Sequence, residues 1–314
     1  MKNIKPKKKS SIGGQAVLEG VMMRGPDSIS MCVRKPDGEV VIEKKPYKAF
    51  TEKVKVFKLP ILRGVVAFFE SMIIGMKTLM NSADYYDIDV DEPDYKPSKF
   101  EEFITKLFGD KLKDAIVAFS LILSIFLGVG LFIVIPNIIA KLTFSSDRFM
   151  YNVVEGIVRL VIFFLYIVLI SYMEDIRRVF QYHGAEHKTI HCYEHEECLT
   201  VENIRKYPVL HPRCGTSFLL IVMVVSIGVF SFFWDENFWI TLSERLALLP
   251  LVAGISYEII KYAGKSESML AEAISVPGLW MQKFTTREPD DSQIEVAIKA
   301  LENVIVEDPE ADRW

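Results

Sequence analysis

The sequence predicts a predominantly α-helical, polytopic membrane bundle of about four transmembrane helices, with a small N-terminal cytoplasmic β unit and interfacial amphipathic helices. Half of the 314 residues are apolar, and the mean hydropathy of +0.23 is high for a soluble domain. Long uncharged stretches indicate helices that cross a bilayer. Shorter alternating segments near the start indicate strands.

The N-terminal region is expected to hold a tail and a β unit. Residues 1–12 form a basic tail, predicted to be disordered, whose lysines either stay solvated or contact anionic headgroups. Residues 13–58 form the β unit. There "QAVLEGVMMR" and "SISMCVRK" predict strands, and a Pro-Asp-Gly turn joins the second of them to "EVVIEKK" as a hairpin.

Residues 59–82 predict an amphipathic helix. Its only charges, Arg63, Glu70 and Lys77, are spaced by seven and form a narrow polar stripe on an apolar helix. Such a helix either lies in the membrane interface or packs against the bundle. Residues 83–114, which are acidic, aromatic and proline-bearing at first, predict a linker and a pre-membrane helix.

Residues 115–173 predict the first two transmembrane helices. Ala115 to Ala140 carries no charge and is long enough to cross the hydrocarbon core, with a kink expected at Pro136. Gly156 to Met173 contains one charge, Arg159, placed four residues after a glutamate with which it can pair.

Residues 216–263 predict two further spans. Thr216 to Trp234 carries no charge. Leu246 to Ala263 is the weakest candidate because Glu258 and Lys261 lie in its second half. A helix buried against the other three would have the same pattern, so full crossing by this segment stays open.

The orientation follows from the distribution of Lys and Arg. The loop from Ser171 to Gly215 holds six of them, whereas the segments 141–154 and 235–245 hold two and one. Basic residues favour the cytoplasmic side, so both termini and the loop 174–215 are expected there. Residues 264–314 form a cytoplasmic C-terminal segment, with Trp280 as an interfacial anchor and an amphipathic helix in "DSQIEVAIKALENVIV" that starts with a Ser292–Glu295 capping box.

All five histidines lie in the loop 174–215. Four of them, His183, His187, His191 and His195, recur every four residues, and His211 follows in "HPRCGTS". On a helix each step of four overshoots a full turn by about 40°, so His183 and His195 lie about 120° apart. One adjacent pair can therefore share an ion, but all four cannot.

The sequence predicts a metal site in this loop. His183 and His187 share one helix face. The sequence H-x-x-C supplies His211 and Cys214, and the resulting His3Cys set suits Zn(II), although another divalent metal is possible. No disulfide is expected from the four cysteines, all of which fall on the predicted cytoplasmic side. A solvated loop that contacts headgroups or a partner is the alternative, and it is preferred for His191 and His195; Cys192 and Cys198 form at most an accessory soft site.

Glu186 is the candidate catalytic residue. It precedes His187 and completes the order H-x-x-E-H, in which a glutamate serves as general base of a metal-dependent hydrolase.

Several long motifs resemble a known family. They are "GGQAVLEGVMMRGP", "LRGVVAFFES", "YHGAEHKTI", "VENIRKYPVLHPRCGTSFLL" and "PGLWMQKFTTREP", which run from about Gly13 to about Pro289. Together they resemble the YqhQ-like bacterial membrane proteins, a family of unknown function with a predicted metal-dependent activity. The resemblance implies a bacterial cytoplasmic membrane protein. The family pattern falls on His183, Glu186, His187, His211, Cys214, Gln15, Glu19 and Arg24.

Two functions remain open from the sequence. The first is a metal-dependent hydrolase of unknown substrate. The second is a non-enzymatic scaffold for membrane-protein biogenesis with a structural zinc, whose partner could be the translocon, the ribosome or another membrane protein. A net charge of −4 argues against a dedicated nucleic-acid binder. The few midplane charges and the lack of repeated halves disfavour a transporter.

Overall fold

A computed structural model describes residues 9–86, 112–144, 147–233, 237–266, 268–306, 308 and 311–312. Most of the predicted basic tail and of the predicted linker lies outside these residues. The chain divides into two compact units, Met1–Asp87 with Tyr166–Trp314, and Ile88–Leu165.

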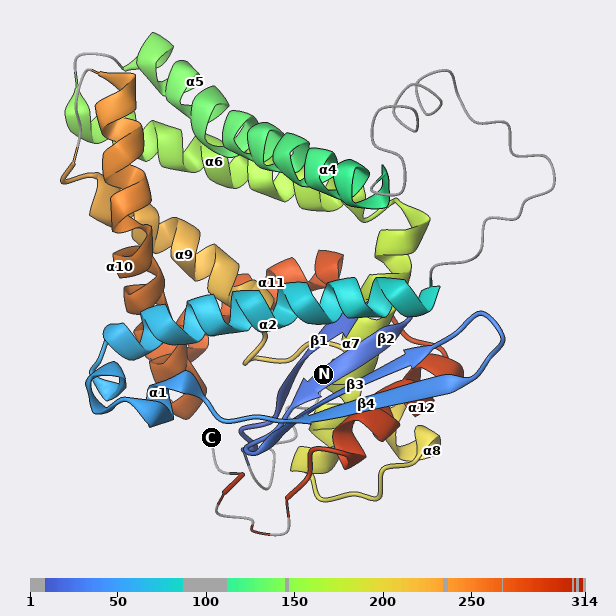
Figure 1. Cartoon of the computed structure of the whole chain (residues 1–314). Coiled ribbons are helices and arrows are strands. Elements are labelled where there is room, and N and C mark those ends of the chain that lie inside the picture. Colours follow the sequence, from blue (N-terminus) through green and yellow to red (C-terminus); the bar gives the residue numbers. More distant parts are fainter. Residues whose placement is uncertain are drawn as a thin grey trace. The chain divides into compact units, whose positions relative to one another are not determined.

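The predicted N-terminal β unit is confirmed as a four-stranded antiparallel sheet in the order β1-β2-β3-β4 (Figure 1). Its strands are β1 (Gly13–Val17), β2 (Gly20–Arg24), β3 (Ser28–Arg34) and β4 (Val40–Pro46). The prediction of one strand over "QAVLEGVMMR" is wrong, because Val17 pairs with Gly20 across a tight turn and Glu19 takes a φ of 48° there. Apolar residues on both sides of this turn hide it in the sequence pattern.

The two central strands of the sheet, β2 and β3, are buried on both faces. Helices α7 (Glu174–Glu194) and α12 (Asp291–Glu302) pack on one face, over Val21, Met23 and Cys32. Helix α2 (Leu62–Tyr86) packs on the other, over Met22 and Met31 (Figure 1). Because successive side chains of a strand point to opposite faces, this double burial explains the unbroken apolar run in β2.

Two short helices precede α2 in the chain: α1 (Phe50–Lys53) and the 3-10 helix η1 (Lys55–Lys58). Its polar stripe has partners: Arg63 pairs with Glu258 of helix α10 (Phe238–Lys265), and Glu70 accepts a hydrogen bond from the Phe50 amide. Of the two charges that weakened the fourth predicted span, Glu258 is therefore neutralised. A groove of about 1040 Å³ lies between α2 and strands β3 and β4.

Three helical segments among the described residues are long and apolar enough to cross a membrane: Ala118–Thr143, Phe149–Ile170 and Trp239–Lys265. The first joins α4 (Leu112–Val129), a π turn η3 (Gly130–Val134) and α5 (Ile135–Thr143); the second belongs to α6 (Arg148–Ile170). Helix α9 (Gly215–Phe230) is apolar but shorter, with 16 residues. The four predicted apolar helices are thus three long ones and a shorter one. The segment expected to be the weakest span, Leu246 to Ala263, belongs to a helix that is long enough to cross a membrane.

The first apolar segment contains Pro136, which cannot donate a hydrogen bond to the carbonyl of Phe132 four residues earlier. Arg159 of α6 donates from Nε to that carbonyl at 2.9 Å and pairs with Glu155 at 2.5 Å, as expected for this pair. A π turn just before the proline relaxes the backbone where a kink was predicted.

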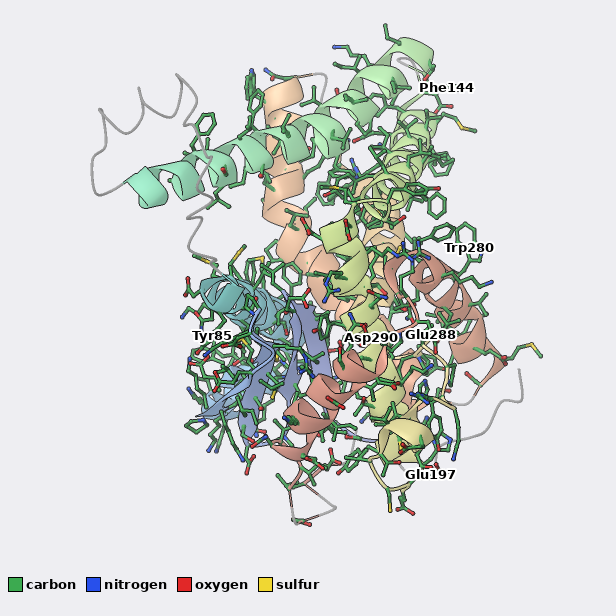
Figure 2. The ribbon with its side chains drawn as sticks, turned by 90° about the vertical axis from the view of Figure 1, so that its right-hand side faces the viewer. Tyr85, Phe144, Glu197, Trp280, Glu288 and Asp290 are labelled. Atoms are coloured by element: carbon green, nitrogen blue, oxygen red, sulfur yellow. The ribbon has the colours of Figure 1, made fainter. Side chains whose placement is uncertain are left out.

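The remaining helices are α8 (Val201–Ile204) and α11 (Met269–Thr285), with α12 after them. Asp290, labelled in Figure 2, is the N-cap of α12. It forms a capping box with Gln293, so the predicted Ser292–Glu295 box is wrong by two residues. The apolar positions of α12, including Ile294 and Leu301, are buried against α7 and the sheet. Trp280, on α11, is half exposed.

Candidate metal centre

Helix α7 carries the candidate residues through the middle of its unit. An unusual number of its polar side chains are buried, among them Glu186, His187, Lys188 and Glu194. Gly184 allows the chain after α11 to come close, since a Cβ at this position would lie 2.0 Å from the carbonyl oxygen of Arg287. Helix α7 is thus held against the segment that follows α11.

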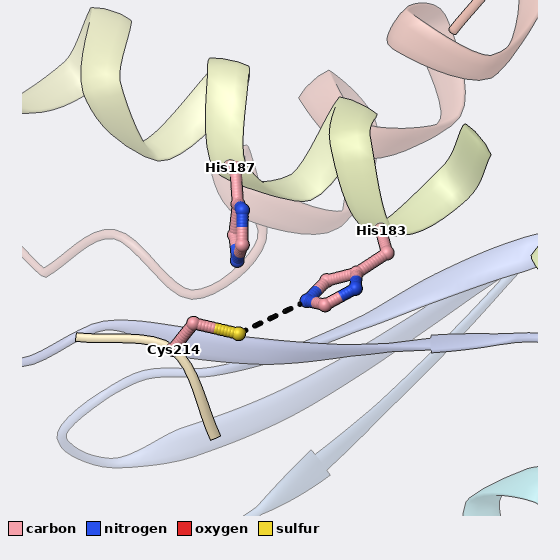
Figure 3. A group of neighbouring side chains, drawn as sticks. All are labelled: His183, His187 and Cys214. Atoms are coloured by element: carbon pink, nitrogen blue, oxygen red, sulfur yellow. Dashed lines mark hydrogen bonds between the residues drawn. The ribbon is translucent and has the colours of Figure 1, made fainter. Parts of the chain in front are cut away.

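Three side chains form the first group. His183 and His187 point from adjacent turns of α7 toward Cys214, which caps the N-terminus of α9 (Figure 3). His183 Nε2 lies 3.2 Å from Cys214 Sγ, and one ligand atom of each residue lies within 4.8 Å of the other two. These separations suit three ligands of one ion at bond lengths of about 2.0–2.3 Å.

Backbone carbonyls orient both imidazoles. Nδ1 of His183 lies 2.8 Å from the carbonyl of Thr285, and Nδ1 of His187 lies 2.6 Å from that of Val209. Each Nδ1–H therefore donates to a carbonyl, and the lone pair of each Nε2 faces the group. This is the usual support of a metal-binding histidine. His187 Nε2 is buried and has no hydrogen-bond partner among the described residues.

The protonation states also suit a metal ligand set. Burial lowers the pKa of His187, so this imidazole is neutral at neutral pH. Burial acts to raise the pKa of the Cys214 thiol, but the neighbouring His187 and contacts with Thr216 outweigh it and lower that pKa. Both shifts favour the forms that bind zinc, which are a neutral imidazole and a thiolate.

Glu186 lies beside this group and is buried. Burial raises the pKa of its carboxyl to about 7, opposed by His183 and by a hydrogen bond from the backbone of Gly14. A Cβ on Gly14 would lie 2.9 Å from Cδ of Glu186, so only glycine lets β1 come this close. Oε2 of Glu186 has no hydrogen-bond partner among the described residues.

His191, Glu194 and His211 form a second group, with one ligand atom from each within 4.8 Å of the others. Burial lowers the pKa of both histidines to about 4. Burial would raise the pKa of Glu194, but His211, Arg213 and the Ser10 amide lower it to about 2. At neutral pH the histidines are neutral and the carboxylate is ionised.

The structure thus distributes the predicted residues over two places. His183, His187 and Cys214 come together, whereas His211 lies in the second group with His191, a residue for which a solvated loop was preferred. His195 belongs to neither group, and neither do Cys192 and Cys198, which are free thiols.

The residues implied near the start of the chain lie elsewhere. Gln15 contacts the Gly75 carbonyl of α2, Arg24 contacts Ser71 of α2, and Glu19 pairs with Arg178 of α7. The residue of this motif that reaches Glu186 is Gly14. In the sequence, only the Gly-Gly pair of the motif indicated that another part of the chain comes close. The sequence did not indicate which residue that is.

The fold and the two groups define a membrane protein with buried His/Cys and His/Glu clusters that could hold a metal ion. The chain belongs to the DUF1385 family of proteins of unknown function, whose family model matches residues 59–307. It is 35% identical over 297 residues, 93% of this chain and 92% of the relative, to the uncharacterized protein YqhQ of Bacillus subtilis (strain 168). No solved structure matches the chain.

Proposed function

We propose that this protein is a metal-dependent hydrolase of the cytoplasmic membrane, with zinc or another divalent ion held by His183, His187 and Cys214. The observation that carries the proposal is the donor set: two imidazole Nε2 atoms and the sulfur of Cys214 converge, and Nε2 of His187 has no hydrogen-bond partner among the described residues. His211 lies in the other group, so this set has three protein ligands. Three ligands leave a tetrahedral ion one position for a substrate, as in catalytic zinc sites.

Glu186 supplies the acid–base chemistry in this proposal. The chemistry that a bound divalent ion supplies is Lewis-acid polarisation of the substrate. Oε2 of Glu186 takes the proton from the attacking water and returns it to the leaving group. A carboxyl with a pKa of about 7 can do both near neutral pH. The contact with Gly14 holds the carboxylate in place.

We expect Glu186→Gln to keep the ion and the fold but to lose hydrolysis by about 100-fold or more, because the amide cannot accept the proton. Ion content, thermal denaturation and turnover of chromogenic ester, phosphoester and peptide substrates would be measured on full-length protein. Glu174→Gln, an exposed change in the first turn of the same helix, is the matched control. Unchanged turnover in Glu186→Gln would remove Glu186 from the mechanism.

A structural zinc in a non-enzymatic scaffold for membrane-protein biogenesis is the second candidate. The deep burial of His187 and Cys214, 1% and 7% exposed, favours it. X-ray absorption on the zinc-loaded protein separates the two. Three protein ligands and one oxygen support the hydrolase, whereas four protein ligands indicate a closed structural site.

We also propose that the metal-bearing loop faces the cytoplasm. Cys198 is the exposed cysteine of this loop, and in the sequence the apolar segment Phe149–Ile170 separates it from Lys141. A membrane-impermeant maleimide should label Cys198 only after the membrane is opened. In a Cys198→Ser background, Lys141→Cys should be labelled in intact cells. Labelling of Cys198 in intact cells would reverse the orientation.

A further inference from the structure

We propose that the second group, His191, Glu194 and His211, binds a divalent first-row metal ion of its own, next to the site formed by His183, His187 and Cys214. This second ion goes beyond the proposed function, which needs only the ion of the first group. Two imidazoles and one carboxylate are a ligand set used for Zn(II) and for Fe(II).

The separation of the ligand atoms is the first argument. Nε2 of His211 lies 3.6 Å from Oε2 of Glu194, and the two imidazole rings lie 4.6 Å apart between centroids. A distance of 3.6 Å is too long for a hydrogen bond. It is close to the roughly 3.3–3.6 Å between two ligands of one tetrahedral ion with bonds of about 2.0–2.2 Å.

The burial of an unpartnered nitrogen is the second argument. His211 is 4% exposed, and its Nε2 has no hydrogen-bond partner among the described residues. A buried polar atom without a hydrogen-bond partner costs folding stability. An ion between His211 and Glu194 would remove that cost.

The surrounding contacts hold the other atoms of the group in the forms that bind an ion. Nε2 of His191 lies 2.9 Å from the Leu210 carbonyl and donates to it, which leaves Nδ1 as the ligand atom. Oε1 of Glu194 is occupied by Arg213 and by the Ser10 amide at 2.8 Å, so Oε2 stays available. Outer-shell partners of this kind fix the ligands of metal sites.

Binding at His211 has an identifiable cost. The Arg213 amide donates to Nδ1 of His211 at 3.3 Å, so an ion at Nε2 requires the imidazole proton to move to Nδ1 and this long hydrogen bond to break. A single long hydrogen bond contributes little net stability, whereas ion binding by a buried protein site contributes much more, so this cost is small beside it.

The test counts ions in full-length protein loaded with Co²⁺ and then with Zn²⁺. Wild type should bind two ions per chain. His191→Ala should bind one and keep the thiolate-to-cobalt absorption, which also shows that the variant is folded. Cys214→Ala should bind one and lose that absorption. His195→Ala, one turn further along α7 and in neither group, should bind two.

The outcomes separate this proposal from the proposed function. One ion in wild type, with thiolate absorption and no change in His191→Ala, overturns the second site and leaves the first. One ion that His191→Ala removes and Cys214→Ala retains overturns the first site and supports the second. Two ions that persist in His191→Ala place the second ion elsewhere and overturn the proposal. No bound ion overturns both sites.

Discussion

Replacing His187 with alanine is expected to remove the ion of the first group. In the proposed site His187 is one of three ligands, and its Nε2 has no hydrogen-bond partner among the described residues. Loss of an outer-shell partner alone typically weakens metal affinity 10–100-fold, so loss of a ligand should weaken it by more than about 100-fold. The ion content should fall by one per chain, and the thiolate-to-cobalt absorption should disappear.

His195→Ala is the matched control for this change. His195 is also a buried histidine at the same spacing, at the C-terminal end of α7, and its Nδ1 bonds the His191 carbonyl at 2.7 Å. Its replacement removes comparable volume and leaves the side chains of the first group untouched. Equal ion content in the two variants, measured by elemental analysis after equilibrium dialysis, would contradict the assignment of His187.

The sequence predicted the pairing of His183 with His187 because the spacing of four on a helix is a local property. The partner of that pair was harder to predict. His211 and Cys214 are separated by a proline and an arginine in "HPRC", and the path of that loop sends His211 toward Glu194 and Cys214 toward His183. A ligand set drawn from two segments depends on tertiary packing, which spacing does not report.

In the fold, too, local properties of one segment could be predicted from the sequence, whereas tertiary packing could not. Long apolar runs predicted the membrane helices directly, because crossing a bilayer requires length and hydrophobicity within one segment. The sheet was harder to predict, since burial on both faces removes the alternation that marks a strand and hides a turn at Glu19. The role of α12 as part of the core also depends on tertiary packing, in this case against α7.

Gly184→Ala is expected to damage both the fold and the first metal group. Alanine favours a helix interior over glycine by about 1 kcal/mol, which alone would stabilise α7. The new Cβ, however, would lie 2.0 Å from the Arg287 carbonyl oxygen and 3.3 Å from Cγ1 of Val209. A backbone carbonyl cannot rotate away as a side chain can, so α7 or the segment after α11 must move. Overpacking of this kind costs about 1–3 kcal/mol or more and outweighs the gain.

Of the two neighbours that Gly184→Ala would displace, Val209 orients a histidine itself and Arg287 lies next to a segment that orients the other. Val209 supplies the carbonyl for Nδ1 of His187, and Thr285, two residues before Arg287, supplies the carbonyl for Nδ1 of His183. Ion affinity should therefore fall about 10–100-fold together with the denaturation temperature. Gly228→Ala in α9 is the control, because a Cβ there meets nothing within 4 Å. If Gly184→Ala behaves like Gly228→Ala in calorimetry and ion titration, the close approach of α7 to Arg287 does not support the metal group.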